Sequence, residues 1–389
     1  MIVFVSNFLN HHQFPICDAL IKLTGGDFVF IATEPIHAER LNMGYADMNH
    51  KYDFVLCSYD SDENRQKALK LCFDCDVLIH GSAPDEYFKA RVKAKRITFK
   101  YGERFFKTPF VMKNILPRTL SMLKHVIPYQ NKNYYLLCAS AYMSKDSAIY
   151  GCFRERCFKW GYFPAVKKYD NIDELIGSKH PASILWVARL IEFKHPEMPI
   201  AVAKRLKADG YDFKINMIGN GELEAATREL IEREGVADCV EMLGAMKPHE
   251  VREHMEKSEI FLFTSDRNEG WGAVMNESMN SACAVVANSA IGSVPFLIND
   301  GENGYMYKDG DVDDLYRKVK ALLDNAGERR RLGINAYKTM AEEWNAENAA
   351  KKLVTLCEKM LAGEYKPFPY KSGVCSKAEI LENGWYKNG

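Results

Sequence analysis

The sequence lacks an excess of charge of either sign and lacks any long apolar run. Its 389 residues include 52 basic and 52 acidic side chains, so the formal net charge is zero, which argues against a general nucleic-acid-binding protein. No stretch reaches the roughly 18 apolar residues that a membrane-spanning helix needs. Residues 1–5 open directly on a strand pattern with no basic segment before it, so we expect no secretory signal peptide.

Paired cysteines at zinc spacing and a dinucleotide fingerprint are also missing. The 11 cysteines are scattered along the chain, which is typical of reduced thiols in a cytosolic protein. Cys72 and Cys75 form one CxxC with no second pair at zinc spacing, so we expect them to be buried fillers. The first strand pattern is not followed by GxGxxG, which argues against a dinucleotide cofactor there.

What the sequence does contain is an alternation of strand and helix patterns in two halves. Length alone favours two domains, because a single core stops growing at about 250–300 residues. Short apolar runs that alternate with helical patterns predict α/β domains on parallel, doubly wound sheets. We expect a Rossmann-like domain over residues 1–164, a linker over 165–182, a second such domain over 183–344, and a final helix with a tail over 345–389. A capping-box motif predicts one short helix in the tail at 376–379.

In the second half, candidate ligand-binding residues follow each of four successive strand patterns. They are Arg189 and Lys194, then Gly219, Asn220 and Gly221, then Met246, then Glu269, Gly270, Trp271 and Gly272, with Glu277 eight residues after Glu269. The carboxyl ends of parallel strands meet at one edge of a sheet, and open α/β sheets bind ligands there. We therefore expect these residues to surround one site.

The chemistry of this set fits a nucleoside-diphosphate sugar. Arg189 and Lys194 can bind a diphosphate. The guanidinium of Arg189 can donate two parallel hydrogen bonds, and the ammonium group of Lys194 provides a single positive charge. The glycines after the second strand let the backbone approach a ligand, and the helix that follows offers free N–H groups. Glu277 can accept hydrogen bonds from a ribose diol, and Glu269 from hydroxyl groups beyond the diphosphate. Two such acids alone are more often surface charges, but the ordered set indicates a site.

These motifs resemble the retaining GT-B glycosyltransferases of family 4, the glycosyl transferases group 1. The resemblance covers about residues 183–361 and rests on Arg189-Leu190 with Lys194, Gly219-Asn220-Gly221-Glu222, Glu269 with Gly270, Gly272 and Glu277, the turn at 300–305, and Trp344. It implies two Rossmann-like domains that face each other across a cleft, with the C-terminal helix returning to the N-terminal domain. It also implies that Arg189 and Lys194 bind the donor diphosphate, Glu277 the ribose and Glu269 the donor sugar.

The first half is similar to that family only in layout, and it would form the acceptor side. His11 and His12 stand in the first loop, where many members have Gly-Gly, and Glu103 follows the fifth strand pattern, where many have a histidine. These three residues are candidates to orient the acceptor or the sugar, because loops at strand ends often carry function. The alternatives are a histidine that caps the first helix and a Glu103 that pairs with Arg104.

Residues 104–145 contain no acidic side chain, although seven basic residues alternate there with apolar ones. A basic amphipathic segment can lie on an anionic membrane surface. A basic helical face packed on its own domain explains the same pattern, because any surface helix is amphipathic. The sequence leaves both interpretations open.

The resemblance and the site together lead us to expect a retaining hexosyltransferase. It would move a hexose from a UDP- or GDP-sugar to a glycan or lipid-linked acceptor in bacterial cell-surface polysaccharide synthesis. No DxD motif suited to Mg²⁺ or Mn²⁺ stands out, so we expect neither a metal nor another cofactor, with Arg189 and Lys194 stabilising the departing nucleotide. The expected location is the cytoplasm, at the inner face of the plasma membrane if residues 104–145 bind an anionic surface, and no nucleic acid is expected as a partner. The alternatives are a GT-B sugar-nucleotide epimerase or hydrolase and a non-catalytic nucleotide-sugar-binding module.

Overall fold

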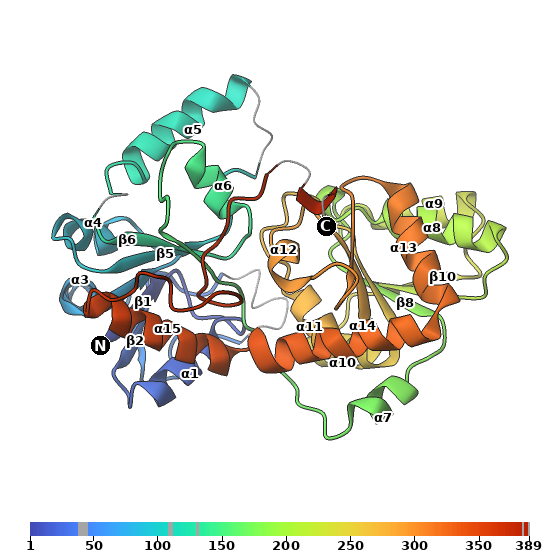
Figure 1. Cartoon of the computed structure of the whole chain (residues 1–389), viewed down its shortest axis with the longest axis horizontal. Helices are drawn as coiled ribbons and strands as arrows, with labels where there is room; N and C mark the ends of the chain where they lie inside the picture. The colour runs from blue at the N-terminus through green and yellow to red at the C-terminus, as the bar shows by residue number, and fades with distance from the viewer. Residues whose placement is uncertain (38–45, 108–111, 130–131, 383–384, 388–389) are drawn as a thin grey trace. The chain divides into compact units, whose positions relative to one another are not determined.

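The computed structural model describes residues 1–37, 46–107, 112–129, 132–382 and 385–387. The chain divides into two compact units (Figure 1). The first unit comprises Met1–Ala165 with Trp344–Leu381, and the second comprises Val166–Glu343 with Glu382–Gly389. Among the described residues, no helix is long and apolar enough to span a bilayer.

The first unit is built on a seven-stranded sheet with the order β3-β2-β1-β4-β5-β6-β7. Its strands, all parallel, are β1 (Ile2–Ser6), β2 (Phe28–Ala32), β3 (Val55–Cys57), β4 (Val77–His80), β5 (Thr98–Gly102), β6 (Tyr134–Cys138) and β7 (Cys157–Lys159). Strands β1, β4 and β6 are buried along their whole length, whereas the edge strand β3 is fully buried only at Cys57. This difference arises because helices cover both faces of a parallel sheet at its centre.

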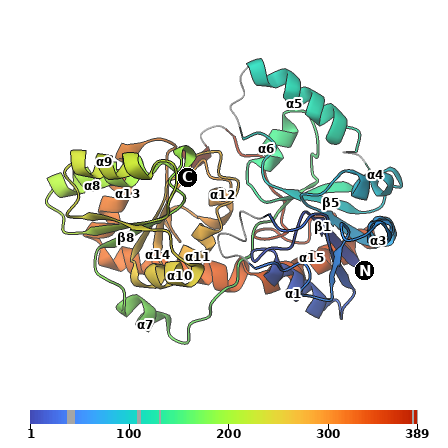
Figure 2. The same ribbon diagram turned by 180° about the vertical axis from the view of Figure 1, so that it is seen from behind.

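The helices of this unit include one, α15, that follows the second unit in the sequence. They are α1 (Phe14–Leu23), α3 (Asp62–Asp74), α4 (Glu86–Lys93), α5 (Met112–His125), α6 (Met143–Ala148) and α15 (Ala346–Leu361). Helix α15 packs along α1, as both views show (Figures 1 and 2), and α3 packs on α4. The buried face of α15 follows a helical period, with Ala349, Leu353, Leu356 and Met360 among its residues.

The tail after α15 extends the first sheet instead of forming a helix. The Lys159 N–H donates to the Ser376 carbonyl at 2.8 Å, and the Cys375 N–H donates to the Lys159 carbonyl at 2.9 Å. The Ala378 N–H donates to the Cys157 carbonyl at 2.9 Å. The short helix expected at 376–379 is therefore wrong. The segment lies antiparallel beside β7 and satisfies backbone groups that an edge strand would otherwise expose.

The second unit is built on a six-stranded sheet with the order β10-β9-β8-β11-β12-β13. Its strands, also parallel, are β8 (Ser183–Val187), β9 (Lys214–Ile218), β10 (Val240–Gly244), β11 (Ile260–Phe263), β12 (Ala284–Asn288) and β13 (Tyr305–Tyr307). Its helices are α7 (Ile172–Gly177), α8 (Glu197–Ala208), α9 (Glu224–Arg233), α10 (Pro248–Lys257), α11 (Val274–Asn280), α12 (Val294–Leu297), α13 (Val312–Asp324) and α14 (Ala326–Lys338), with the short turns η1 (Glu192–Lys194) and η2 (Thr339–Glu343). Helices α8, α9 and α13 pack together, and α10, α11 and α14 form a second group.

The predicted fold class is confirmed. Both units are α/β, each has a parallel doubly wound sheet, and the C-terminal helix belongs to the first unit. The sequence did not indicate α7, which lies inside the stretch 165–182 that we expected to be a linker. Asn171 begins this helix, because its side-chain oxygen accepts hydrogen bonds from the N–H groups of Asp173 and Glu174.

Candidate functional site

The strand order of the second unit fixes where a ligand site is expected. From β8 the chain continues to β9 on one side, and it returns on the other side of β8 as β11. This reversal between β8 and β11 is a topological switch point, and open α/β sheets bind ligands beyond the carboxyl ends of the strands there. Arg189 and Lys194 follow β8, and Glu269 and Glu277 follow β11.

Lys194 and Glu269 form an ion pair at this switch point. Lys194 ends the turn η1, Glu269 lies in the loop before α11, and their side chains are only 12% and 14% exposed. The Ser265 hydroxyl donates to the same carboxylate oxygen, Oε2, at 3.1 Å. The structure thus brings together two predicted site residues that lie 75 positions apart in the chain.

Thr264, the residue after β11, holds the backbone of this pair. Its hydroxyl accepts a hydrogen bond from the Trp186 indole N–H at 2.8 Å and donates to the Lys194 carbonyl at 2.7 Å. The Asp266 N–H donates to the Phe193 carbonyl at 2.9 Å. The loops after β8 and β11 are therefore tied directly to each other, so the ion pair sits on a rigid frame.

His195 adds a second basic group that the sequence reasoning missed. Its Nδ1 lies 2.7 Å from a Glu197 oxygen, and its Nε2 lies 3.5 Å from an Asp266 oxygen. The hydrogen bond to Glu197 is the main cause that raises the pKa of His195. Its position directly after Lys194 was the only available sequence signal, because Asp266 reaches it from another loop.

The glycines after β9 have a structural reason as well as the predicted ligand role. A Cβ at Gly219 would lie 1.8 Å from the Ala188 carbonyl oxygen, and one at Gly221 would lie 2.4 Å from the Leu190 carbonyl oxygen. Between them lies the exposed Asn220. Its backbone carbonyl accepts a hydrogen bond from the Leu190 N–H at 2.8 Å. The backbone of Gly219 and Gly221 therefore packs closely against the loop that carries Arg189.

The remaining predicted donor residues differ in what they offer a ligand. Trp271 is fully buried, and its indole N–H donates to Asn276 Oδ1 at 2.9 Å, so only its backbone is available to a donor. Gly270 is buried and Met246 is half-buried. Gly272 has a φ of 76°, and a Cβ there would lie 2.2 Å from the Phe263 ring. In the described part of the chain, no acidic residue forms an ion pair with the exposed Arg189.

Glu277 lies in α11 with its carboxyl group poorly solvated. Burial raises the pKa of Glu277, and the positive charge of Arg252 opposes that rise. Arg252 donates to the Glu277 carbonyl at 3.0 Å, not to its carboxylate, and also to Asn280 Oδ1 at 3.0 Å. Among the described residues, no side chain donates a hydrogen bond to this carboxylate. A perturbed carboxyl group in this position is a candidate acceptor for ligand hydroxyls.

In the first unit, Tyr162 connects the three predicted residues. The rings of His11 and His12 have centroids 3.7 Å apart, and the Tyr162 ring lies 6.2 Å from that of His12, at 15° to it. The Tyr162 hydroxyl donates to Glu103 Oε1 at 2.8 Å, and Lys107 Nζ lies 2.8 Å from Oε2 of the same residue. These residues follow the carboxyl ends of β1, β5 and β7. Tyr162 was missed because nothing in its local sequence marks it.

The structural alternative for Glu103 is wrong, and neither histidine occupies the N-cap position of α1. Arg104 pairs with Asp146, Nη2 to Oδ1, at 3.1 Å and not with Glu103. Helix α1 begins after Gln13, whose side chain makes no capping hydrogen bond. The loop is instead held by Asn10 Oδ1, which accepts from the N–H groups of His12 and Gln13 at 3.0 and 3.1 Å.

Helix α5 has both a packed and an exposed side. Met122 and Arg118 are buried, and the Arg118 guanidinium lies 4.9 Å from the Phe106 ring centroid. Leu116, Leu120 and Leu123, at helical spacing, are 67%, 56% and 51% exposed. Packing on its own unit therefore accounts for only one side of this segment.

The CxxC cysteines lie in the interior as expected. Cys72 and Cys75 are both free and buried. Burial raises the pKa of the Cys72 thiol, and it raises the pKa of Cys75 to about 11. Neither thiol is therefore activated as a thiolate at neutral pH.

The fold described above, with its two Rossmann-like units, is that of the GT-B glycosyltransferases. Residues 170–339, which are less than half of the chain, match the family model of the glycosyl transferases group 1.

Particular relatives match the chain over part of its length. The amylovoran biosynthesis glycosyltransferase AmsK of Erwinia amylovora is 28% identical over 185 residues, 46% of this chain and 45% of the relative. The putative colanic acid biosynthesis glycosyltransferase WcaL of Salmonella typhimurium is 31% identical over 144 residues, 36% and 35% of the two chains. The alignments thus span less than half of these relatives. A crystal structure of Anabaena HepE in complex with UDP shares the fold, with a TM-score of 0.66 and 12% identity over 92% of this chain and 99% of that one.

Proposed function

We propose that the protein is a retaining, metal-independent hexosyltransferase. It moves a hexose from a UDP- or GDP-sugar to a glycan or lipid-linked acceptor in bacterial cell-surface polysaccharide synthesis. The Lys194–Glu269 pair at the switch point is the observation that carries this proposal, and the exposed Arg189 precedes Lys194 in the same loop after β8. The match of residues 170–339 to the group 1 family and the biosynthetic names of AmsK and WcaL support it.

The Lys194–Glu269 ion pair indicates how the positive charge of Lys194 is neutralised with and without a donor. Without a donor, Glu269 neutralises Lys194. A bound diphosphate offers Lys194 a second anionic partner, and Glu269 then becomes available to accept hydrogen bonds from the sugar hydroxyls. Arg189 reaches the phosphates from the surface, and Glu277 accepts from the ribose.

Transfer then follows from electrostatic stabilisation. The bond between the anomeric carbon and the diphosphate oxygen breaks, and the electron pair leaves with the nucleotide. Arg189 and Lys194 stabilise that negative charge. The acceptor oxygen attacks from the face that the diphosphate leaves, which retains the configuration. The leaving phosphate takes the acceptor proton, so no protein base is needed.

Donor screening tests the function directly. Purified protein is first screened with UDP- and GDP-sugars by thermal shift, because a ligand of the folded state raises its melting temperature. Donors that bind are then assayed for release of UDP or GDP, with and without glycan or lipid-linked acceptors. Acceptor-dependent release supports transfer. Release without any acceptor would indicate a hydrolase, donor isomerisation an epimerase, and binding without turnover a non-catalytic module.

The metal-free mechanism makes a prediction about chelation. We expect that the transfer rate measured in EDTA does not rise when excess Mg²⁺ or Mn²⁺ is added, because Arg189 and Lys194 supply the positive charge that a metal would otherwise supply. The assay compares initial rates before and after the addition. A rate that EDTA abolishes and Mn²⁺ restores would overturn this part of the proposal.

The exposed side of α5 supports attachment to the inner face of the plasma membrane. Leu116, Leu120 and Leu123 form an apolar row, and Lys124 beside them is exposed. We expect Leu116→Glu with Leu120→Glu to weaken binding to anionic vesicles at least about tenfold, since burial of each leucine contributes about 1.5–3 kcal/mol. Co-sedimentation with phosphatidylglycerol vesicles measures this effect. Leu361→Glu, at a leucine that is 54% exposed on α15, is the matched control and should bind normally. Equal binding by all three proteins would contradict the membrane interpretation.

A further inference from the structure

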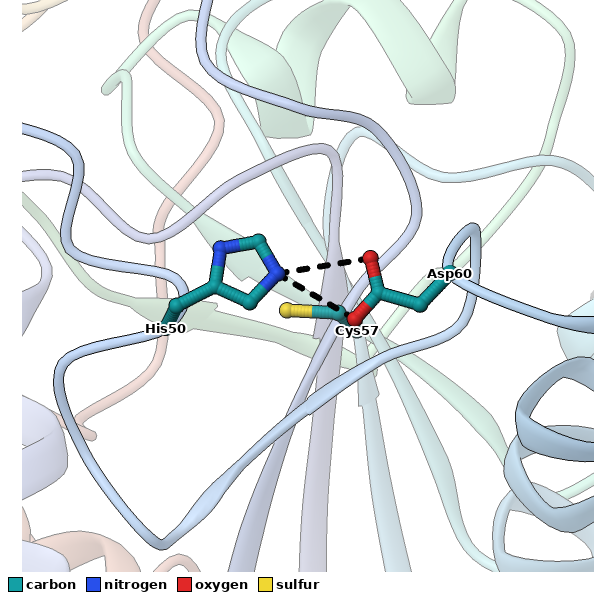
Figure 3. A group of neighbouring side chains, drawn as sticks. All are labelled: His50, Cys57 and Asp60. Atoms are coloured by element: carbon teal, nitrogen blue, oxygen red, sulfur yellow. Dashed lines mark hydrogen bonds and ion pairs between the residues drawn. The ribbon is translucent and has the colours of Figure 1, made fainter.

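A separate group of side chains lies at the outer edge of the first sheet. It consists of His50, Cys57 and Asp60, which we name the edge triad (Figure 3). One ring nitrogen, the sulfur and one carboxylate oxygen all lie within 4.8 Å of one another. His50 Nε2 lies 3.3 and 3.2 Å from the two oxygens of Asp60. The triad therefore offers a nitrogen, a sulfur and an oxygen ligand around one point.

Cys57 lies in a paired strand, and the turn that contains His50 is hydrogen-bonded to its neighbours. Cys57 is the last residue of β3 and pairs with Ala32 of β2. Its S–H donates to the Asn49 carbonyl at 3.6 Å. The buried Asn49 side chain accepts from the Leu9 N–H at 2.9 Å and donates to the Glu34 carbonyl at 3.1 Å. The turn before β3 is thus held on both sides of Asn49, so the backbone of His50 is kept close to the strand that carries the thiol.

A fourth residue supports the imidazole from outside the triad. Asp47 Oδ2 lies 3.5 Å from His50 Nδ1, the ring nitrogen that does not face Asp60. A histidine that binds a metal through one nitrogen usually donates its other N–H to a carboxylate, which orients the ring. The side chains of His50 and Asp60 are 57% and 37% exposed, so an ion and a water molecule can reach the triad from solvent.

We propose that the edge triad binds one Zn²⁺-like divalent transition metal through His50 Nε2, the Cys57 thiolate and an Asp60 oxygen, with water in the fourth position. Mixed imidazole, thiolate and carboxylate ligands suit zinc and not magnesium or calcium. Bonds of about 2.0–2.3 Å place tetrahedral ligands up to about 3.8 Å apart, so a small rotation of the two exposed side chains completes the site. Binding displaces the Cys57 proton and any proton between His50 and Asp60.

The metal would stabilise the first loop of this unit. Asn49 joins the turn of His50 to Leu9, which lies in the same loop as His11 and His12. A metal that holds His50 against β3 therefore limits the motion of Asn49 and, through it, of Leu9. The role is structural, and it depends neither on the donor site nor on transfer activity.

Cobalt titration tests the site. Full-length protein, reduced and freed of metal by chelator, is titrated with Co²⁺, which gives a thiolate-to-metal charge-transfer band when a cysteine binds it. We expect the band to saturate at one equivalent and to disappear when Zn²⁺ is added. Cys57→Ser should lose it, and Asp47→Asn should weaken Co²⁺ binding by about 10–100-fold. Cys239→Ser is the matched control, because the Cys239 S–H also donates to a backbone carbonyl, that of Val236 at 3.4 Å, and it should keep the band.

Failure of the proposal would be equally visible. It is overturned if the unaltered protein gives no such band, or if the band persists in Cys57→Ser. Should Cys57→Ser not fold, His50→Gln and Asp60→Asn alter exposed side chains and serve instead, and unchanged Co²⁺ affinity in both would refute the site. As a second measurement, Zn²⁺ should raise the melting temperature of the unaltered protein but not that of His50→Gln combined with Asp60→Asn.

Discussion

Replacing Lys194 with alanine is expected to lower kcat/KM for transfer by about 10²–10³-fold, the usual effect of removing one group that stabilises transition-state charge. Two causes combine. The substitution removes a point charge from the departing diphosphate, and it leaves the nearly buried Glu269 carboxylate without its ion-pair partner. That unpaired carboxylate would then repel the phosphates of the donor.

A double-mutant cycle separates the two causes. If repulsion by Glu269 contributes, Lys194→Ala with Glu269→Gln should be less impaired than the sum of the single effects predicts, because neighbours in one ion pair are not additive. Lys204→Ala is the matched control, since Lys204 pairs with Glu234 on the surface of the same unit and its loss should leave transfer unchanged. A Lys194→Ala enzyme within about threefold of the parent, less than the loss of one such group causes, would refute the assigned role.

Replacing Glu269 with glutamine is expected to reduce kcat by about 10²-fold, while the affinity for free UDP or GDP stays the same or increases. The amide keeps the size of the side chain and can still accept from Ser265, but it no longer neutralises Lys194 or binds sugar hydroxyls as a carboxylate. Lys194 is then freer to bind phosphate, so nucleotide binding and turnover should change in opposite directions. Steady-state kinetics together with calorimetric titration of the nucleotide measure both quantities.

Glu256→Gln provides the control for this experiment. Glu256 also forms an ion pair with a lysine of the second unit, Lys167, at 2.6 Å, but that pair does not involve the loops of the switch point. Its replacement should change neither turnover nor nucleotide affinity. If Glu269→Gln transfers sugar as fast as the parent, the contact assigned to Glu269 is wrong.

The sequence predicted most of the framework, because buried parallel strands are marked by continuous apolar runs. Strands β2, β4, β6 and β11 lie where such runs occur, and their order along the chain was enough to predict doubly wound sheets. The segment 376–379 was wrongly predicted to be helical because its sequence matches a helix capping box, whereas the open edge of β7 offers the tail backbone partners. Local propensity gave way to a tertiary contact.

In the candidate site, too, the sequence predicted the positions of residues after strands but not the contacts between loops. The positions of Lys194 and Glu269 after neighbouring strands predicted that they lie near each other, but not that they pair directly. The contributions of Tyr162 and of Asp266 beside His195 come from loops distant in sequence, so they depend on how the loops fold and not on any motif. Side-chain partners across loops are what a single sequence does not specify.

The packing of α15 along α1 has a consequence for how the chain is made. Every strand of the second unit lies within one continuous stretch, Val166–Glu343, whereas the first unit needs the segment Trp344–Leu381 to be complete. Domains usually fold in the order in which they leave the ribosome. Here the N-terminal 165 residues precede the second unit in the chain, yet the side of α1 that packs on α15 lacks this partner until α15 has been translated. The six strands of the second unit can therefore all pair before α15 has been made, whereas the first unit is complete only after α15 has docked on α1.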